Sequence, residues 1–265
     1  VLASYGRFGT YQFGVGGGTQ LGDSTWLRMD VNQYGSDGYV DRMDPESTNV
    51  TASVLWQATD DFDVEFQVDY LDDSLADYWG TPLVPLSDVV LTSTGETVDE
   101  QARFRNFNVR DSRAVSDQLL FRVDLSWRLS DDIELKNTTY SFNADRDWGN
   151  AEGYVYCTAV VDVCTETDVI QRYYGYFFVT HDQDLLGNRL TANINSQIAG
   201  RENRFLAGVE LTNLDFSRAR GFRRNIPLVA GDSVNPIAPV PGNYGSRELR
   251  GISPTKIDTR AVFFE

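Results

Sequence analysis

The chain has 265 residues, of which 41% are hydrophobic and 12% aromatic, and its formal net charge is -16. Such a polyanion is not expected to bind nucleic acid, because affinity for phosphate comes from clustered lysine and arginine. No segment approaches the roughly 20 consecutive apolar residues that a membrane-spanning helix needs, and no signal peptide is visible at Val1.

One hairpin pattern occurs twice. Leu55–Glu65 and Ser126–Leu135 each carry a tryptophan near the end of an alternating strand, turn on Thr/Ser-Asp-Asp and enter a second alternating strand. Asp and Ser favour such turns because their side chains can form hydrogen bonds with the local backbone. The two copies therefore predict two tight hairpins between antiparallel strands.

Apolar and polar residues alternate through the predicted strands, which is the period of a β-strand. The alternation is clearest over Phe62–Tyr70 and Gln118–Leu129, and further apolar rows lie in Val50–Trp56, Leu190–Ile198 and Phe205–Leu211. These rows tend to contain or end in aromatic residues, as in an interfacial aromatic girdle. A soluble sandwich is less consistent with them, because a second sheet would have to cover the apolar rows.

Two places depart from the simple alternation. The strand that starts at Ile133 changes its apolar side near Asn137, which predicts a β-bulge there. The segment Ile170–Ala199 is long for one strand and contains Leu186-Gly187-Asn188. We expect a long strand that is kinked or interrupted near Gly187, because a turn at that point would break the alternation of turns described next.

Tight turns and long connections alternate along the chain, which is typical of an antiparallel transmembrane β-barrel. Tight turns are expected at 21–24, 59–61, 130–132 and 200–203, and long external loops near 35–46, 74–116, 148–169 and 218–256. The predicted fold is thus all-β, with about eight strands and the start of a ninth. An odd number of strands, the last of them unfinished, cannot close into a barrel without exposing unpaired backbone groups of the edge strands to lipid. We therefore expect residues 1–265 to be a fragment of a larger barrel.

Several segments resemble the barrel of a TonB-dependent outer-membrane receptor of the ferric-siderophore type. The resemblance covers nearly the whole chain and depends on the order and spacing of the segments. They are Leu2–Tyr11 for the first barrel strand, Gly38–Asp41 for the first external loop, Leu55–Asp61 for the second periplasmic turn, Tyr78–Pro82 for the next external loop, and Phe205–Glu210 and Asp258–Glu265 for later strands.

This resemblance implies a barrel of about 22 strands around an N-terminal plug, placed in the bacterial outer membrane. Its function would be the energy-coupled import of ferric siderophores, and iron would be present only as the siderophore chelate, with no covalently bound cofactor. The implied partners are the ferric siderophore, lipopolysaccharide and outer-membrane lipid, and the inner-membrane TonB complex acting through an N-terminal box. The resemblance would place the plug and the box ahead of Val1, so neither is expected within residues 1–265.

Other functions fit the same pattern. Within the family the cargo could instead be cobalamin, haem or an oligosaccharide. Outside it, the chain could belong to a passive porin-like barrel, or to an adhesin or phage receptor whose loops bind macromolecules. Energy dependence of uptake separates an importer from a porin, and expression repressed by iron separates siderophore cargo from the other cargoes.

A ligand site is expected in the long outer loops. A ferric siderophore is a compact chelate, often anionic, and aromatic faces with a few arginine donors suit it. Arg218, Arg220, Arg223 and Arg224 form a basic cluster that would attract such a chelate, or would instead hold lipopolysaccharide phosphates or balance nearby acids. The candidate ligand-binding residues are Tyr78, Trp79, Trp148, Tyr154, Tyr156, Phe222, Arg223, Arg224 and Tyr244.

The two cysteines, Cys157 and Cys164, are expected to form a disulfide across a surface loop in an oxidising compartment, and two free thiols are the alternative. Their spacing fits no zinc motif and His181 is the only histidine, so no metal site is expected from this chain alone. The paired aspartates all lie at predicted turns or strand ends, where turn formation explains them. We find no catalytic constellation, and the chain is not expected to be an enzyme.

Overall fold

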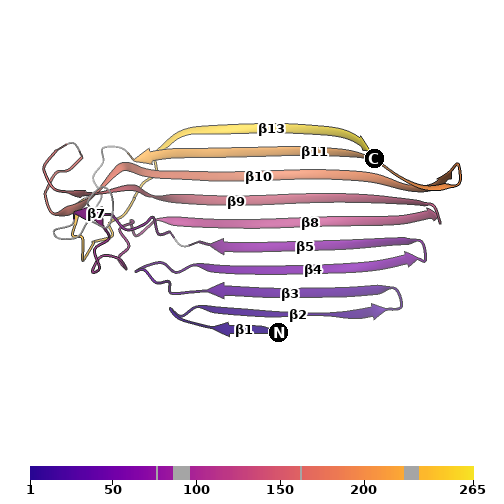
Figure 1. Cartoon of the computed structure of the whole chain (residues 1–265), viewed down its shortest axis with the longest axis horizontal. Coiled ribbons are helices and arrows are strands. Elements are labelled where there is room, and N and C mark those ends of the chain that lie inside the picture. The colour runs from indigo at the N-terminus through magenta and orange to yellow at the C-terminus, as the bar shows by residue number, and fades with distance from the viewer. Residues whose placement is uncertain (76, 86–95, 162, 224–232) are drawn as a thin grey trace.

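The structure is a computed structural model that describes residues 1–75, 77–85, 96–161, 163–223 and 233–265; for residues 174, 175 and 223 it describes the backbone alone. The strands form an 11-stranded sheet in the order β1-β2-β3-β4-β5-β8-β9-β10-β11-β13, with β12 paired to β10. Strands β1 and β13 lie at opposite edges, so the described sheet is not closed (Figure 1). No helix in the described ranges is long and apolar enough to cross a membrane.

The strands lengthen toward the C-terminal half of the chain. Figure 1 shows the long strands side by side, with the long connections gathered at one end and the tight turns at the other. Their bounds are β1 Leu2–Tyr5, β2 Tyr11–Gly22, β3 Thr25–Gly35, β4 Glu46–Thr59, β5 Phe62–Ser74, β6 Val84–Pro85, β7 Glu96–Thr97, β8 Arg113–Ser130, β9 Ile133–Cys157, β10 Val169–Ile198, β11 Arg201–Arg223, β12 Ser233–Val234 and β13 Leu249–Phe264.

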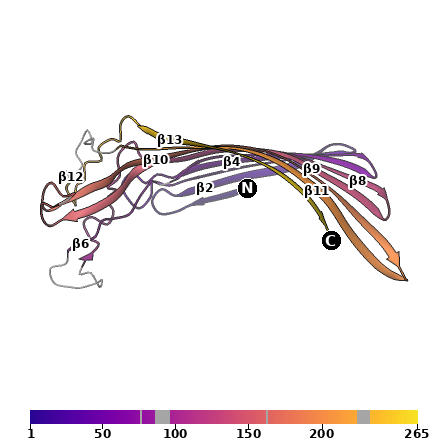
Figure 2. The ribbon, with the colours of Figure 1, turned by 90° about the horizontal axis from the view of Figure 1, so that it is seen from above.

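The two faces of the sheet differ in chemistry because directly paired residues point to the same side. Phe66 pairs with Val54 on one side and Val123 on the other, and we call this face the outer face. Glu65 pairs with Leu55 and Asp124 on the opposite face, which we call the inner face. On the outer face none of the described residues forms a layer over the apolar rows, since Trp56 is 47% exposed, Phe121 47% and Trp127 50%. Figure 2 shows this single curved layer from above.

The first strand of the chain differs from the expectation. Leu2–Tyr5 is a strand of its own, β1, which pairs back on β2 with Tyr5 opposite Tyr11. The amide of Gly6 donates to the carbonyl of Thr10 (2.7 Å), which closes the connecting turn. The main path consequently contains one strand more than the sequence suggested.

The single long strand expected over Ile170–Ala199 is confirmed by β10, but the predicted bulge near Asn137 and the interruption near Gly187 were wrong. The pairing of β8, β9 and β10 passes Asn137 without a shift, and the same is true at Gly187. At Asn137 the loss of apolar phase has another origin: Tyr140 and Phe142 lie on the inner face, and Asn137 lies on the outer face in hydrogen bonds with Asn188. Gly187 is needed because a Cβ there would collide with the Tyr140 ring on the neighbouring strand.

Two of the long loops expected from the sequence begin as strands. Strand β9 continues to Cys157 and β10 starts at Val169, so the first part of the segment 148–169 is strand and only 158–168 connects the two strands. Strand β11 likewise continues to Arg223, into the segment expected as a loop from residue 218. Polar and aromatic composition suggested loops here, but the strands of this sheet extend beyond the apolar rows.

The β10–β11 turn is formed by Ala199 and Gly200, which lie just before or at the start of the expected turn segment 200–203. Both residues have positive φ, 52° for Ala199 and 75° for Gly200. Two consecutive positive φ values are what a type I′ hairpin turn requires, and Asn-Gly is its preferred sequence. Alanine is strained in this conformation because its Cβ approaches the following carbonyl oxygen.

We therefore expect the substitution Ala199→Asn to raise the free energy of unfolding by about 0.5–1 kcal/mol, since asparagine tolerates the left-handed conformation. Thermal or denaturant unfolding of the full-length protein in detergent measures the effect. The substitution Gly200→Ala serves as the opposite control and should lower the stability. A lower unfolding midpoint for Ala199→Asn would contradict the turn geometry.

Candidate ligand-binding site

The long connections pack together at one end of the sheet into a unit that we call the cap: the described residues of 36–45, 75–112, 150–176 and 233–248. Two buried clusters form its core. One contains Val109, Ala151, Tyr176 and Tyr244 of the cap together with Phe178 of β10. The other contains Ala102, Phe107, Ile170 and Val234.

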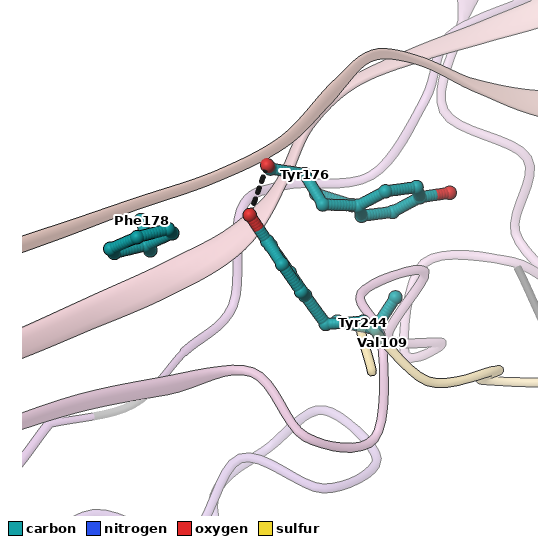
Figure 3. Packing of buried hydrophobic residues seen from close by; sticks show 5 residues of the cluster. Val109, Tyr176, Phe178 and Tyr244 are labelled. Carbon is teal, nitrogen blue, oxygen red and sulfur yellow. Dashed lines mark hydrogen bonds between the residues drawn. The ribbon is translucent and has the colours of Figure 1, made fainter. Parts of the chain in front are cut away.

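The first cluster accounts for Tyr244, which the sequence suggested as a ligand contact. Its side chain is only 3% exposed, and its ring meets that of Tyr176 edge-on with centroids 5.5 Å apart. The Tyr244 hydroxyl donates a hydrogen bond to the Tyr176 carbonyl (Figure 3). Tyr244 thus joins the last described connection to β10 and is not available to a ligand.

A cavity of about 440 Å³ lies between the cap and the inner face of the sheet. Trp79 enters it from the cap, whereas Arg146 and Trp148 reach it from β9 and His181 from β10. These β9 and β10 residues share the inner face because Trp148 pairs with Val179 and Arg146 pairs with His181. Few polar groups and much aromatic surface in a concave site are the usual features of a small-molecule site.

An aromatic row starts at Trp79 and Trp148, which line the cavity, and continues beyond it along the inner face. The ring centroids of Trp79 and Trp148 are 5.5 Å apart, those of Trp148 and Phe177 5.7 Å, and those of Phe177 and Phe222 5.3 Å. The separations are those of favourable aromatic pairs. Trp79 remains 49% exposed, so it offers a ring face to the solvent side of the row.

Cations lie next to the aromatic row. Arg146, His181 and Arg218 occupy one register row of the inner face on β9, β10 and β11, and Arg220 lies opposite Val179 in the next row. Among the described residues none of these three arginines forms an ion pair, whereas Asp147 on the outer face is paired with Arg113 and Arg247. In a chain of net charge -16, this is a local positive surface that would attract an anion.

The other candidate residues have different positions. Tyr78 donates or accepts a hydrogen bond with Thr81 (2.6 Å) and packs edge-on against Tyr39. Tyr154 packs on Phe107 in the cap core. Its hydroxyl has no hydrogen-bond partner among the described residues, and burial raises its pKa. The Tyr156 hydroxyl donates to Asp168 at the base of the hairpin loop (3.0 Å).

The structure does not test the two arginines Arg223 and Arg224, which the sequence suggested as ligand contacts. Arg223 ends β11, with its backbone opposite Tyr176. Arg224 lies outside the described residues. Of the sequence candidates, the aromatic row therefore brings together Trp79, Trp148 and Phe222.

Cys157 and Cys164 form a disulfide with a Cα–Cα distance of 5.6 Å. Cys157 is the last residue of β9, directly opposite Val169 at the start of β10. The amide of Asp168 also donates to the carbonyl of Cys157 (2.8 Å). The covalent bond and the hydrogen bonds together hold the outermost connection of the β9–β10 hairpin.

Sequence reasoning did not include Arg146, Phe177 or His181 among the candidate ligand-binding residues, although it interpreted His181 as a strand residue facing the lumen or the membrane interface. The signal was present, since Arg146 and Trp148 are two residues apart, as are Phe177, Val179 and His181. We ended one predicted strand near Trp148 and did not follow the alternation through the start of the next strand, Ile170–Ala199. Extending the period of two through both segments would have placed these side chains together.

The comparisons with known proteins agree with this architecture. No family model matches the sequence, and no curated protein is significantly similar to it. Among solved structures, the ferric-catecholate import receptor Fiu from E. coli K12 matches 99% of this chain with a TM-score of 0.79 at 14% identity. The siderophore receptor PiuA from Acinetobacter baumannii matches 99% of it with a TM-score of 0.74 at 11% identity.

A third match is the ferripyoverdine receptor of the outer membrane of Pseudomonas aeruginosa, which covers 99% of this chain with a TM-score of 0.71 at 11% identity. The chain has the fold of part of a siderophore-receptor barrel. This confirms, at the level of fold, the resemblance found in the sequence. The chain spans 40% of Fiu, 38% of PiuA and 33% of the ferripyoverdine receptor.

The position of Tyr244 gives a direct test of which aromatic residues belong to the site. The substitution Tyr244→Phe removes the buried hydrogen bond to the Tyr176 carbonyl and should lower the free energy of unfolding by about 1 kcal/mol. Thermal unfolding of the full-length protein measures this change. Affinity for a ferric chelate should stay the same, and a loss of affinity without a loss of stability would make Tyr244 a ligand contact after all.

Proposed function

We propose that the chain forms part of the wall and the external loops of a bacterial outer-membrane receptor that imports ferric siderophores. The observation that carries this proposal is the cavity under the cap, which is lined by Trp79, Trp148 and Arg146. Arg218 continues the register row of Arg146 beyond it, and neither arginine has an ion-pair partner among the described residues. The likeness of the fold to siderophore receptors supports the same conclusion. The receptor would bind and translocate its cargo without covalent chemistry.

The composition of the site favours an anionic chelate with aromatic rings. Trp79 and Trp148 offer ring faces for stacking. Arg146 and Arg218 offer fixed positive charge and planar donors that suit carboxylate or catecholate oxygens. The matched receptor Fiu is described as a ferric-catecholate importer, and this chain would take a chelate of similar chemistry.

The site is tested by replacing its charge. The double substitution Arg146→Gln and Arg218→Gln should weaken binding of an anionic ferric tricatecholate by at least about tenfold, because hydrogen bonds to charged groups contribute about 1.5–3 kcal/mol each. A neutral ferric trihydroxamate is the comparison probe and should be affected much less. Quenching of tryptophan fluorescence in the full-length protein reports binding of both.

The matched control is Arg122→Gln. Arg122 is an inner-face arginine of β8, but it is paired with Asp124 (2.6 Å) and lies opposite Tyr140, away from the register row of Arg146 and Arg218. This variant should bind both chelates as the wild type does. Equal losses for the neutral and the anionic probe, or no loss in the double variant, would overturn the proposed site.

Import by this receptor would draw energy from the inner-membrane TonB complex. Uptake of radioactive iron as the ferric tricatecholate should then stop when a protonophore collapses the inner-membrane gradient, while binding at the cell surface continues. Uptake that persists under these conditions would instead identify a passive pore. Lipopolysaccharide and outer-membrane lipid would surround the apolar outer face.

A further inference from the structure

The segment 106–109 lies at the centre of the cap and is buried almost completely. Asn106 is 3% exposed, and Phe107, Asn108 and Val109 are 0% exposed. This segment belongs to no strand, so its backbone groups need partners other than a ladder of strands. The cap supplies these partners from side chains.

Two arginines together donate a hydrogen bond to each of the four carbonyl groups of this buried segment. Arg42 donates to the carbonyls of Asn106 (2.8 Å), Asn108 (2.9 Å) and Val109 (3.2 Å). Arg172 donates from Nε to the carbonyl of Phe107 (2.6 Å). Burial lowers the pKa of Arg42, and the nearby carboxylate of Asp77 opposes this effect. The segment is therefore clamped from the first external connection and from β10.

The side chain of Asn108 connects this clamped segment to the two parts of the chain that carry the tryptophans of the ligand site. We call the segment from Asp77 to Trp79 and the segment from Trp148 to Ala151 the two arms. The Nδ2 atom of Asn108 donates to the carbonyl of Asp77 (2.8 Å), two residues before Trp79. Its Oδ1 accepts from the amide of Ala151 (2.9 Å), three residues after Trp148. A further bond from the Val109 amide to the same oxygen (3.0 Å) fixes the orientation of the amide group.

A second contact holds the Trp79 arm in the same place. The hydroxyl of Ser112 donates to the carboxylate of Asp77 (2.6 Å) and lies within hydrogen-bond distance of the Val109 carbonyl (2.7 Å). Asp77 is thus attached to the clamped segment through its backbone and through its side chain. The free end of the arm, Trp79, then lies against Trp148 with ring centroids 5.5 Å apart.

We propose that Asn108 is a positioning residue of the ligand site: it sets the distance between Trp79 and Trp148 by binding the backbone of both arms, and Arg42 holds it in place. This inference rests on the proposed function in so far as the tryptophan pair receives the chelate. The geometry of the pair itself is independent of any ligand. A buried amide with three bonds is costly to remove, and a residue acting in this way needs no contact with the cargo.

The test uses the full-length protein and a readout that needs no ligand. Two indole rings at this distance couple excitonically, so subtracting the circular dichroism spectrum of Trp79→Phe from that of the wild type gives the signal of the pair. The variant Asn108→Ala should lose most of this couplet while its far-ultraviolet β-sheet signal is kept. Its affinity for the ferric tricatecholate should fall about tenfold, which corresponds to the free energy of about one hydrogen bond.

Two milder variants keep the test decisive if Asn108→Ala does not fold. Asn108→Asp retains an acceptor for Ala151 but loses the donor to Asp77. Ser112→Ala removes only the second contact with Asp77. Both should reduce the couplet and the affinity in parallel. The matched control is Asn235→Ala, which removes hydrogen bonds to the amides of Ile237 and Ala238 in another connection of the cap and should leave both signals unchanged.

The outcomes distinguish this proposal from the proposed function. A parallel loss of couplet and affinity supports the positioning role. A couplet that survives in folded Asn108 and Ser112 variants overturns it, and so does a lost couplet with unchanged affinity. If the wild-type protein binds no ferric chelate, the proposed function fails, while the couplet still reports whether Asn108 holds the two tryptophans together.

Discussion

The hydrogen-bond register of the antiparallel sheet is the constraint on which the rest of this structure depends. Side chains that are directly opposite point to the same face, and a slip of one residue would exchange the faces. The registers shift only near strand ends. Backbone pairing alone consequently places Trp148, Val179 and Arg220 on one wall, although they come from three different strands.

The cap meets a different requirement. Its connections lack a ladder of strands, and buried backbone groups without partners are costly. Arg42 and Arg172 donate to carbonyls of the buried segment 106–109, and Asn108 acts as the hub between that segment and its neighbours. These arginine side chains provide the hydrogen bonds that neighbouring strands would otherwise give to the backbone carbonyls. They thereby hold the connections of the cap together as one packed unit.

The candidate site lies where these two systems meet. The wall contributes rings and cations in fixed register, and the cap contributes Trp79. The chain as a whole is acidic, so neighbouring arginines without a carboxylate partner among the described residues give this part of the inner face a positive charge that an anion can recognise. The strands of the wall thus carry both rings and charge, and the cap adds one further ring, Trp79.

The sequence by itself determined the strands of the outer face and the tight turns at their ends, because alternation in Phe62–Tyr70 and Gln118–Leu129 and the Thr/Ser-Asp-Asp turns are local signals. It also singled out Trp79, Trp148 and Phe222. Only the tertiary structure decided that these three form one row with Phe177, that Tyr244 is buried, and that Asn137 interrupts no strand. Register, loop packing and cross-strand contacts join residues far apart in the chain, and no local pattern contains that information.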